Sequence, residues 1–130
     1  MNDTGAGSKG LVLVVDDDTA VADSVCRFLA SYGYEALQAN DGVSGAALAR
    51  ARRPRVVLLD ISMPGKDGVE VLKELVPELP RTGFIMLSGN GDEEVALACL
   101  KLGAFDYLAK PANLGALETM VRTFLAGVKL

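Results

Sequence analysis

The sequence contains no histidine and no tryptophan, and only two of its 130 residues are cysteine. The absence of histidine excludes imidazole metal sites, acid–base catalysis by histidine and a phosphohistidine on this chain. Cys26 and Cys99 lie far apart and form no Cys-x-x-Cys pair, so we expect two reduced thiols and a cytoplasmic protein.

Long apolar segments and an excess of positive charge are also missing. No run of 18 apolar residues occurs, so the sequence predicts no membrane-spanning helix and no membrane partner. The net charge of −4 argues against direct binding of nucleic acid by this chain. The first residues are polar and glycine-rich, without an apolar signal-peptide core. We expect a disordered lead-in over residues 1–9 and one folded domain over residues 10–130.

Short apolar runs predict the strands, because four or five apolar residues between turn signals are typical of buried parallel strands. The runs are Leu11–Val15, Arg55–Leu59, Phe84–Leu87 and Phe105–Ala109, with a weaker strand over Tyr34–Ala39. Each strong run is followed by polar residues, which are Asp16, Asp17 and Asp18, then Asp60, Ser88 and Lys110. Ligands bind at the carboxyl ends of the strands in an open parallel sheet, so we expect these side chains to converge on one edge.

Helical signals alternate with these strands. The first helix follows Asp18, and Asp18 or Thr19 is expected to cap its start while Gly33 ends it. Further helices are expected from Gly42 through Ala51, Gly68 to Leu75, Asp92 to Leu102, and Leu114 to Val128. The alternation predicts an α/β fold of (βα)5 type, a doubly wound five-stranded parallel sheet with helices on both faces.

The acidic residues after the first and third strong strands suggest a metal and phosphoryl site. The carboxylates of Asp16 and Asp17 are adjacent in sequence and would repel each other unless a cation joined them. Oxygen ligands without histidine or cysteine favour magnesium, with manganese as a substitute. A carboxylate such as that of Asp60 can attack phosphorus and form an aspartyl phosphate. Asp18 fits a helix cap better than a metal ligand.

Four motifs occur together in this chain: Val14–Asp18, Asp60–Gly68, Leu87–Gly89 and Gly103–Pro111. With these motifs in this order, the sequence resembles the receiver domain of bacterial two-component response regulators, the chemotaxis-regulator-like family. The resemblance covers roughly residues 10–127. It implies a flavodoxin-like fold with strand order 2-1-3-4-5, which the spacing of the runs alone does not give.

The resemblance also implies a role for each acidic residue. Asp60 would be the phosphoacceptor, and Asp17, Asp60 and the backbone carbonyl of Ser62 would bind Mg²⁺ directly. Asp16 would act on the metal mainly through a water molecule. The chain would then catalyse only its own phosphorylation and slow autodephosphorylation, and it would not be a conventional enzyme.

Other residues match the positions that sense the phosphoryl group in this family. Lys110 would neutralise charge, and the peptide bond between Lys110 and Pro111 would be cis. Ser88 would hydrogen-bond the phosphoryl group and move towards it, with Gly89 leaving room for that movement. Tyr107, on the last strand, would turn inward as part of the same switch.

The family resemblance extends to lifetime and partners. Two positions tune phosphoryl lifetime in the family, Ser62 and Asn90 here, and neither is a large or acidic side chain. The phosphoryl group would come from a sensor histidine kinase or a phosphotransfer protein, and an output domain or target protein would respond. The responding surface would be the fourth helix, the fifth strand and the last helix. A homodimer through this surface is a hypothesis from the family.

Three other classes of protein share part of this pattern. A haloacid-dehalogenase-type phosphatase would need Asp-x-Asp-x-Thr, and position 20 is alanine after Asp16 and Asp18. Residues Gly5–Gly10 match a dinucleotide-binding pattern but precede the first strand instead of following it. The third alternative is a pseudo-receiver, a protein-interaction module that signals without phosphate, although every site residue of a phosphorylated receiver is present.

Overall fold

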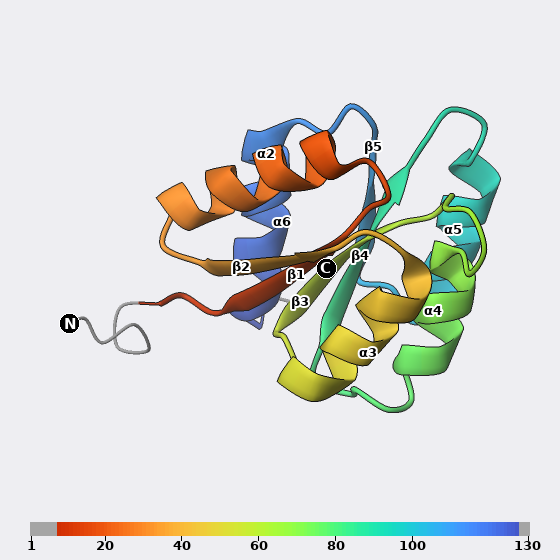
Figure 1. Cartoon of the computed structure of the whole chain (residues 1–130), viewed down its shortest axis with the longest axis horizontal. Coiled ribbons are helices and arrows are strands. Elements are labelled where there is room, and N and C mark those ends of the chain that lie inside the picture. Colours follow the sequence, from red (N-terminus) through yellow and green to blue (C-terminus); the bar gives the residue numbers. More distant parts are fainter. Residues whose placement is uncertain (1–7, 128–130) are drawn as a thin grey trace.

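The structure, a computed structural model, describes residues 8–127. Strands and helices alternate along the chain (Figure 1). The strands are β1 (Leu11–Val15), β2 (Glu35–Ala39), β3 (Val56–Asp60), β4 (Gly83–Ser88) and β5 (Asp106–Ala109). The helices are α2 (Thr19–Ser31), α3 (Gly42–Arg52), α4 (Gly68–Leu75), α5 (Glu93–Lys101) and α6 (Leu114–Leu125). The expected lead-in over residues 1–9 lies mostly outside the described residues, as does Val128.

The strands form one parallel sheet in the order β2-β1-β3-β4-β5. Helices α2 and α6 cover one face, and α3, α4 and α5 cover the other (Figure 1). This is the doubly wound, flavodoxin-like arrangement, so the predicted fold class and strand order are confirmed. None of the helices in the described range is long and apolar enough to cross a membrane.

Alternate residues of the central strands supply two apolar cores. Val12 and Val14 of β1 pack with α2 and α6, whereas Leu13 and Val15 pack with α3 and α4. Strand β3 is buried along its whole length, which explains its continuous apolar run. With a core on each face, the central strands are held rigidly, and the side chains at their carboxyl ends are held with them.

Short polar side chains set the starts of four helices. The side chains of Asp18, Asp41, Asp67 and Asn113 accept hydrogen bonds from backbone N–H groups in the first turns of α2, α3, α4 and α6. The expected cap at Asp18 is therefore confirmed. Glu70 completes a capping box with Asp67. Helix α5 differs, since Asp92 precedes it but its side chain does not cap it.

Gly68 places the start of α4 directly against the end of β3. A Cβ atom at this position would lie 2.1 Å from the carbonyl oxygen of Asp60. The Gly68 N–H donates to the carbonyl of Ile61 at 2.9 Å, so the backbone returns tightly to the strand. No residue larger than glycine fits here without moving the strand end on which Asp60 lies.

Candidate functional site

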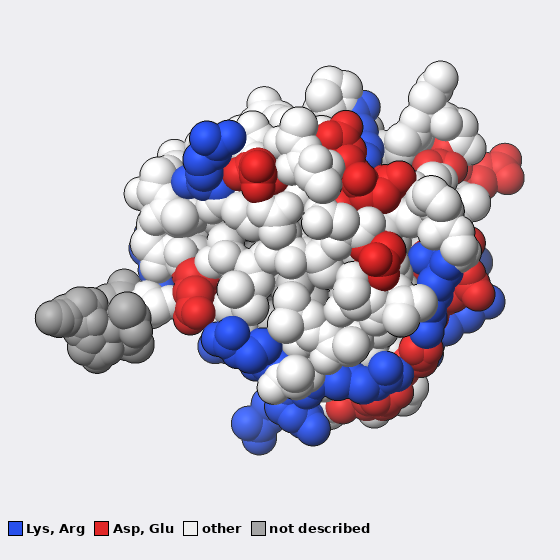
Figure 2. Space-filling model, viewed as in Figure 1, with Lys and Arg blue, Asp and Glu red and all other residues white. Residues whose placement is uncertain are grey.

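Three carboxylates meet where β1 and β3 end. Asp16 and Asp17 follow β1, Asp60 is the last residue of β3, and one oxygen from each lies within 4.8 Å of the others. Asp16 is 0% exposed and Asp60 is 3% exposed, while Asp17 lies at the surface. In Figure 2, acidic side chains gather over the region where β1 leads into α2. Two of the three carboxylates are therefore removed from water and close to each other.

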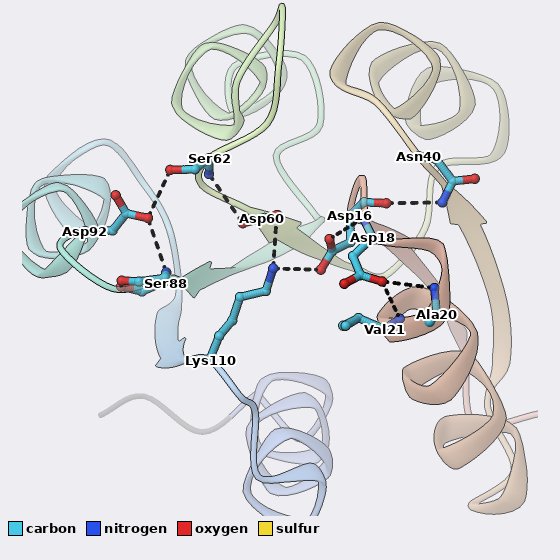
Figure 3. A network of polar contacts seen from close by, with 11 residues as sticks. Asp16, Asp18, Ala20, Val21, Asn40, Asp60, Ser62, Ser88, Asp92 and Lys110 are labelled. Carbon is cyan, nitrogen blue, oxygen red and sulfur yellow. Dashed lines mark hydrogen bonds and ion pairs between the residues drawn. The ribbon is translucent and has the colours of Figure 1, made fainter.

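Lys110 joins the two buried carboxylates from the end of β5 (Figure 3). Its Nζ lies 3.1 Å from Asp60 Oδ2, to which it donates a hydrogen bond, and 3.1 Å from Asp16 Oδ2. The peptide bond between Lys110 and Pro111 is cis. A single positive charge thus faces three negative ones.

Burial and these neighbouring charges together shift the pKa values of Asp60 and Lys110. The pKa of Asp60 is raised from 3.8 to about 6. Burial raises it most, the hydrogen bond from Lys110 opposes the rise, and the charge of Asp16 adds to it. Burial alone would lower the pKa of Lys110, but the nearby carboxylates of Asp60 and Asp16 outweigh it and raise that pKa. The raised pKa of Lys110 favours its charged form. The raised pKa of Asp60 means that its ionised form is destabilised in the folded protein.

One oxygen of this cluster lacks a hydrogen bond. Asp16 Oδ1 accepts from the Asp18 N–H at 2.9 Å, but buried Asp16 Oδ2 accepts no hydrogen bond from the described residues. Lys110 lies close enough to Asp16 Oδ2 for an ion pair only. A buried carboxylate oxygen without a hydrogen bond is costly. A hard divalent cation shared with Asp17 and Asp60 would satisfy it, so the residues present fit Mg²⁺.

The other expected site residues lie around this cluster. Ser88 ends β4 and is 2% exposed, with only a long contact of 3.5 Å from its Oγ to the Gly89 carbonyl. The Ser62 N–H donates to Asp60 Oδ1 at 3.3 Å, and Asn90 lies exposed in the loop after Ser88. Tyr107 is half-buried and packs against the core on the α5 side of the sheet. Its role as a switch remains a prediction.

The sequence did not indicate two residues that touch the site. The Asn40 side chain donates to the Asp16 carbonyl at 3.1 Å, and its position directly after a strand was the available signal. Asp92 Oδ2 accepts from Ser62 Oγ at 3.0 Å and from the Gly89 N–H at 3.2 Å (Figure 3). The residues around Asp92 predict only a helix cap, so nothing local in the sequence indicates its contact with Ser62.

The side chain of Asp92 contacts two positions that the sequence motifs indicated, Ser62 and Gly89. Ser62 is small and neutral, but the fold brings an acidic side chain against its hydroxyl. At Gly89, a Cβ atom would lie 3.3 Å from Asp92 Oδ2, so Asp92 borders the space that the missing side chain leaves. The contact with Ser62 arises because two loops that are distant in sequence meet at the carboxyl edge of the sheet, whereas Gly89 and Asp92 lie three residues apart in one loop.

The comparisons with known proteins agree with this fold. A family model described as the response regulator receiver domain matches residues 12–122. The chain belongs to this family.

The two cysteines, Cys26 and Cys99, lie outside the motifs and are free thiols.

The chain is similar to the nitrogen assimilation regulatory protein NtrX of Azorhizobium caulinodans, with 36% identity over 92% of this chain and 27% of the relative. It is 37% identical to the regulatory protein AtoC of Escherichia coli over 88% of this chain and 25% of the relative. The chain thus spans about a quarter of the length of these relatives. Against the response regulator MprA of Mycobacterium ulcerans, at 37% identity, it spans 51% of the relative.

Solved structures give the same result. A response regulator receiver domain protein from Clostridium thermocellum superposes with a TM-score of 0.87 at 28% identity, covering 90% of this chain and 94% of that one. The receiver domain of the Francisella response regulator 1452 superposes with a TM-score of 0.85 at 30% identity, covering 93% and 100%. The comparisons give no support to a phosphate-independent pseudo-receiver.

Proposed function

We propose that this domain accepts a phosphoryl group on Asp60, in the presence of Mg²⁺, and converts the modification into a signal. The phosphoryl donor is the phosphohistidine of a sensor histidine kinase or of a phosphotransfer protein. One observation supports this more than any other. Lys110 Nζ lies 3.1 Å from both buried carboxylates, and Asp17 completes a set of oxygens within 4.8 Å.

The chemistry follows from the position of Asp60. One carboxylate oxygen of Asp60 forms a bond to phosphorus while the bond between phosphorus and the donor atom breaks, and the electron pair of that bond leaves with the donor. Phosphoryl transfer depends mostly on positioning and charge neutralisation. Lys110 Nζ is placed to offset charge beside Asp60 Oδ2, and the Ser62 N–H fixes the other oxygen of Asp60.

Asp17, Asp60 and the Ser62 backbone carbonyl are the residues proposed to bind the metal directly, with Asp16 acting through water. When bound, Mg²⁺ would neutralise the carboxylates and the phosphoryl oxygens. Asp16 Oδ2, which is buried without a hydrogen bond, supports a cation at this position. Manganese is the expected substitute, because it also prefers oxygen ligands.

Signalling would run from Ser88 to the α5–β5–α6 surface. Within residues 8–127, Ser88 Oγ makes one long hydrogen bond, to the Gly89 carbonyl, which leaves it able to turn towards a phosphoryl group on Asp60. Met86 and Tyr107 are register partners on β4 and β5, which supports coupling between the Ser88 strand and Tyr107. Ser62 and Asn90 are the positions proposed to set phosphoryl lifetime. An output domain or target protein would bind this surface, and a homodimer would use the same elements.

The test is the intact mass of the protein after incubation with acetyl phosphate. Wild type is compared with Asp60→Asn, each with Mg²⁺ and with EDTA. We expect one phosphoryl adduct on the wild type only when Mg²⁺ is present, and no adduct on the variant. The leaving group in this assay is acetate, so no kinase is needed.

Glu94→Gln is the matched control, since Glu94 is an exposed carboxylate in the first turn of α5. This variant should be labelled like wild type. A label that persists in Asp60→Asn, or one that forms equally well in EDTA, would contradict the proposed acceptor or the proposed metal.

A further inference from the structure

Asp92 occupies a helix N-cap position without acting as a cap. An aspartate there usually accepts hydrogen bonds from the N–H groups two or three residues later, which here belong to Glu94 and Val95. Asp92 makes no such bond, and its φ of −99° and ψ of 9° differ from the extended backbone of a capping residue. In the described structure the other four helices all have a side-chain cap. The first turn of α5 therefore keeps backbone donors that its own N-cap side chain does not satisfy.

The Asp92 carboxylate instead links the two loops that flank Asp60. Its Oδ2 accepts from Ser62 Oγ at 3.0 Å and from the Gly89 N–H at 3.2 Å (Figure 3). Ser62 lies two residues after Asp60 and contacts it through its N–H. Gly89 directly follows Ser88. One oxygen atom thus holds the loop after β3 and the loop after β4 in a fixed relation.

These contacts oppose the movement proposed for Ser88. If Ser88 turns towards a phosphoryl group on Asp60, the backbone at Gly89 moves with it and leaves Asp92. A phosphoryl group also adds about −1.5 to −2 charges next to Ser62, which repels the Asp92 carboxylate. A cavity of about 490 Å³ is lined by Ser62, Asp92 and Val95 among others, so the carboxylate has space to move.

We propose that Asp92 is a latch with two positions. While Asp60 is unmodified, its carboxylate holds Ser62 and Gly89. Once Ser88 turns to a phosphoryl group, the carboxylate moves to the N–H groups of Glu94 and Val95 and caps α5. This inference rests on the proposed function and extends it. It names Asp92 as the residue that opposes the movement of Ser88, and α5 as the helix that is capped after that movement.

The first experiment measures amide hydrogen exchange before and after labelling with acetyl phosphate and Mg²⁺. In wild type we expect the Gly89 N–H to exchange faster after labelling, by about tenfold, and the Val95 N–H to exchange more slowly. In Asp92→Ala the Gly89 N–H should exchange fast from the outset, and Val95 should gain no protection. The uncapped state of α5 then persists although Asp60 is labelled.

The second experiment measures the labelling rate. Asp92→Ala and Ser62→Ala should each be labelled faster than wild type, and the double variant should gain less than the product of the two, because both contacts share Asp92 Oδ2. Asp92→Asn keeps an oxygen acceptor without the charge, so it should restore Gly89 protection and be labelled at an intermediate rate. Glu94→Gln, which removes a charge from the same turn, should behave like wild type.

The outcomes separate the latch from the proposed function. If labelled wild type keeps the Gly89 N–H protected, or if Asp92→Ala is labelled at the wild-type rate, the latch is wrong while Asp60 remains the acceptor. If wild type acquires no label on Asp60, the proposed function fails and the latch fails with it.

Discussion

Replacing Asp60 by asparagine should make the domain more stable at neutral pH when no metal is present. The pKa of Asp60 rises from 3.8 to about 6 in the folded protein, mainly because the carboxyl group is buried. A raised pKa means that the contribution of this group to stability is fully present below pH 3.8 and is lost as the pH rises through about 6. At pH 7.5 the ionised carboxylate therefore costs folding free energy, and asparagine removes that cost.

The size of the effect follows from the same shift. About two pKa units correspond to about 3 kcal/mol at pH 7.5 and to about half of that at pH 5. This shift already includes the opposing hydrogen bond from Lys110 to Asp60. We therefore expect the free energy of unfolding of Asp60→Asn to exceed that of wild type by about 1–3 kcal/mol at pH 7.5, with a difference about half as large at pH 5.

Urea denaturation followed by circular dichroism in EDTA measures this difference, provided that the slope of free energy against urea is the same for both proteins. Mg²⁺ at ten times its dissociation constant should stabilise wild type by about 1.4 kcal/mol and the variant by less. Glu94→Gln should stay within about 0.5 kcal/mol of wild type under each condition. An Asp60→Asn variant no more stable than wild type at pH 7.5, or a difference independent of pH, would refute the reasoning.

Three further predictions concern the metal site, the start of α4 and the buried Tyr34. Asp17→Ala should weaken Mg²⁺ binding and labelling together, since Asp17 belongs to the oxygen cluster; calorimetry that shows unchanged affinity would move the metal elsewhere. Gly68→Ala should destabilise the domain by about 2 kcal/mol or more, because its Cβ atom would lie 2.1 Å from the Asp60 carbonyl; an unchanged urea midpoint would argue against this close approach. Burial and the hydrogen bond to Glu118 raise the pKa of Tyr34 from 10 to about 12, so its contribution to stability is present below pH 10 and is lost towards pH 12. Tyr34→Phe should lack that loss, and parallel stability curves for the two proteins would contradict it.

The sequence determined the layers of the fold and the members of the main site. Apolar runs that end in Asp16, Asp60, Ser88 and Lys110 predicted parallel strands and a convergent edge, and the structure brings these residues to that edge. The prediction succeeded because strand length, burial and the position of a strand end are local properties of the chain. The strand order came from the family resemblance, because spacing does not define which strands are neighbours.

Element ends show the limits of local patterns. Strand β4 was expected over Phe84–Leu87 and extends over Gly83–Ser88. Gly83 belongs to the strand because it pairs with Val56 of β3. Glycine is required there because a Cβ atom would lie 2.6 Å and 2.7 Å from ring carbon atoms of Phe124. That requirement depends on how α6 packs, and the residues around Gly83 do not reveal it.

Only the tertiary structure decided the hydrogen-bond partners of Asp92 and Glu118. Asp92 reads as a cap for its own helix, yet it bonds to Ser62, 30 residues earlier in the chain. Glu118 lies on the apolar stripe of α6 and is 4% exposed, where it accepts a hydrogen bond from Tyr34, 84 residues away. Hydrophobic periodicity and capping preferences act over a few residues, so they determine the elements and their ends. The partner of a polar side chain depends on which loops and helices the packed sheet brings together, and that is decided by the fold as a whole.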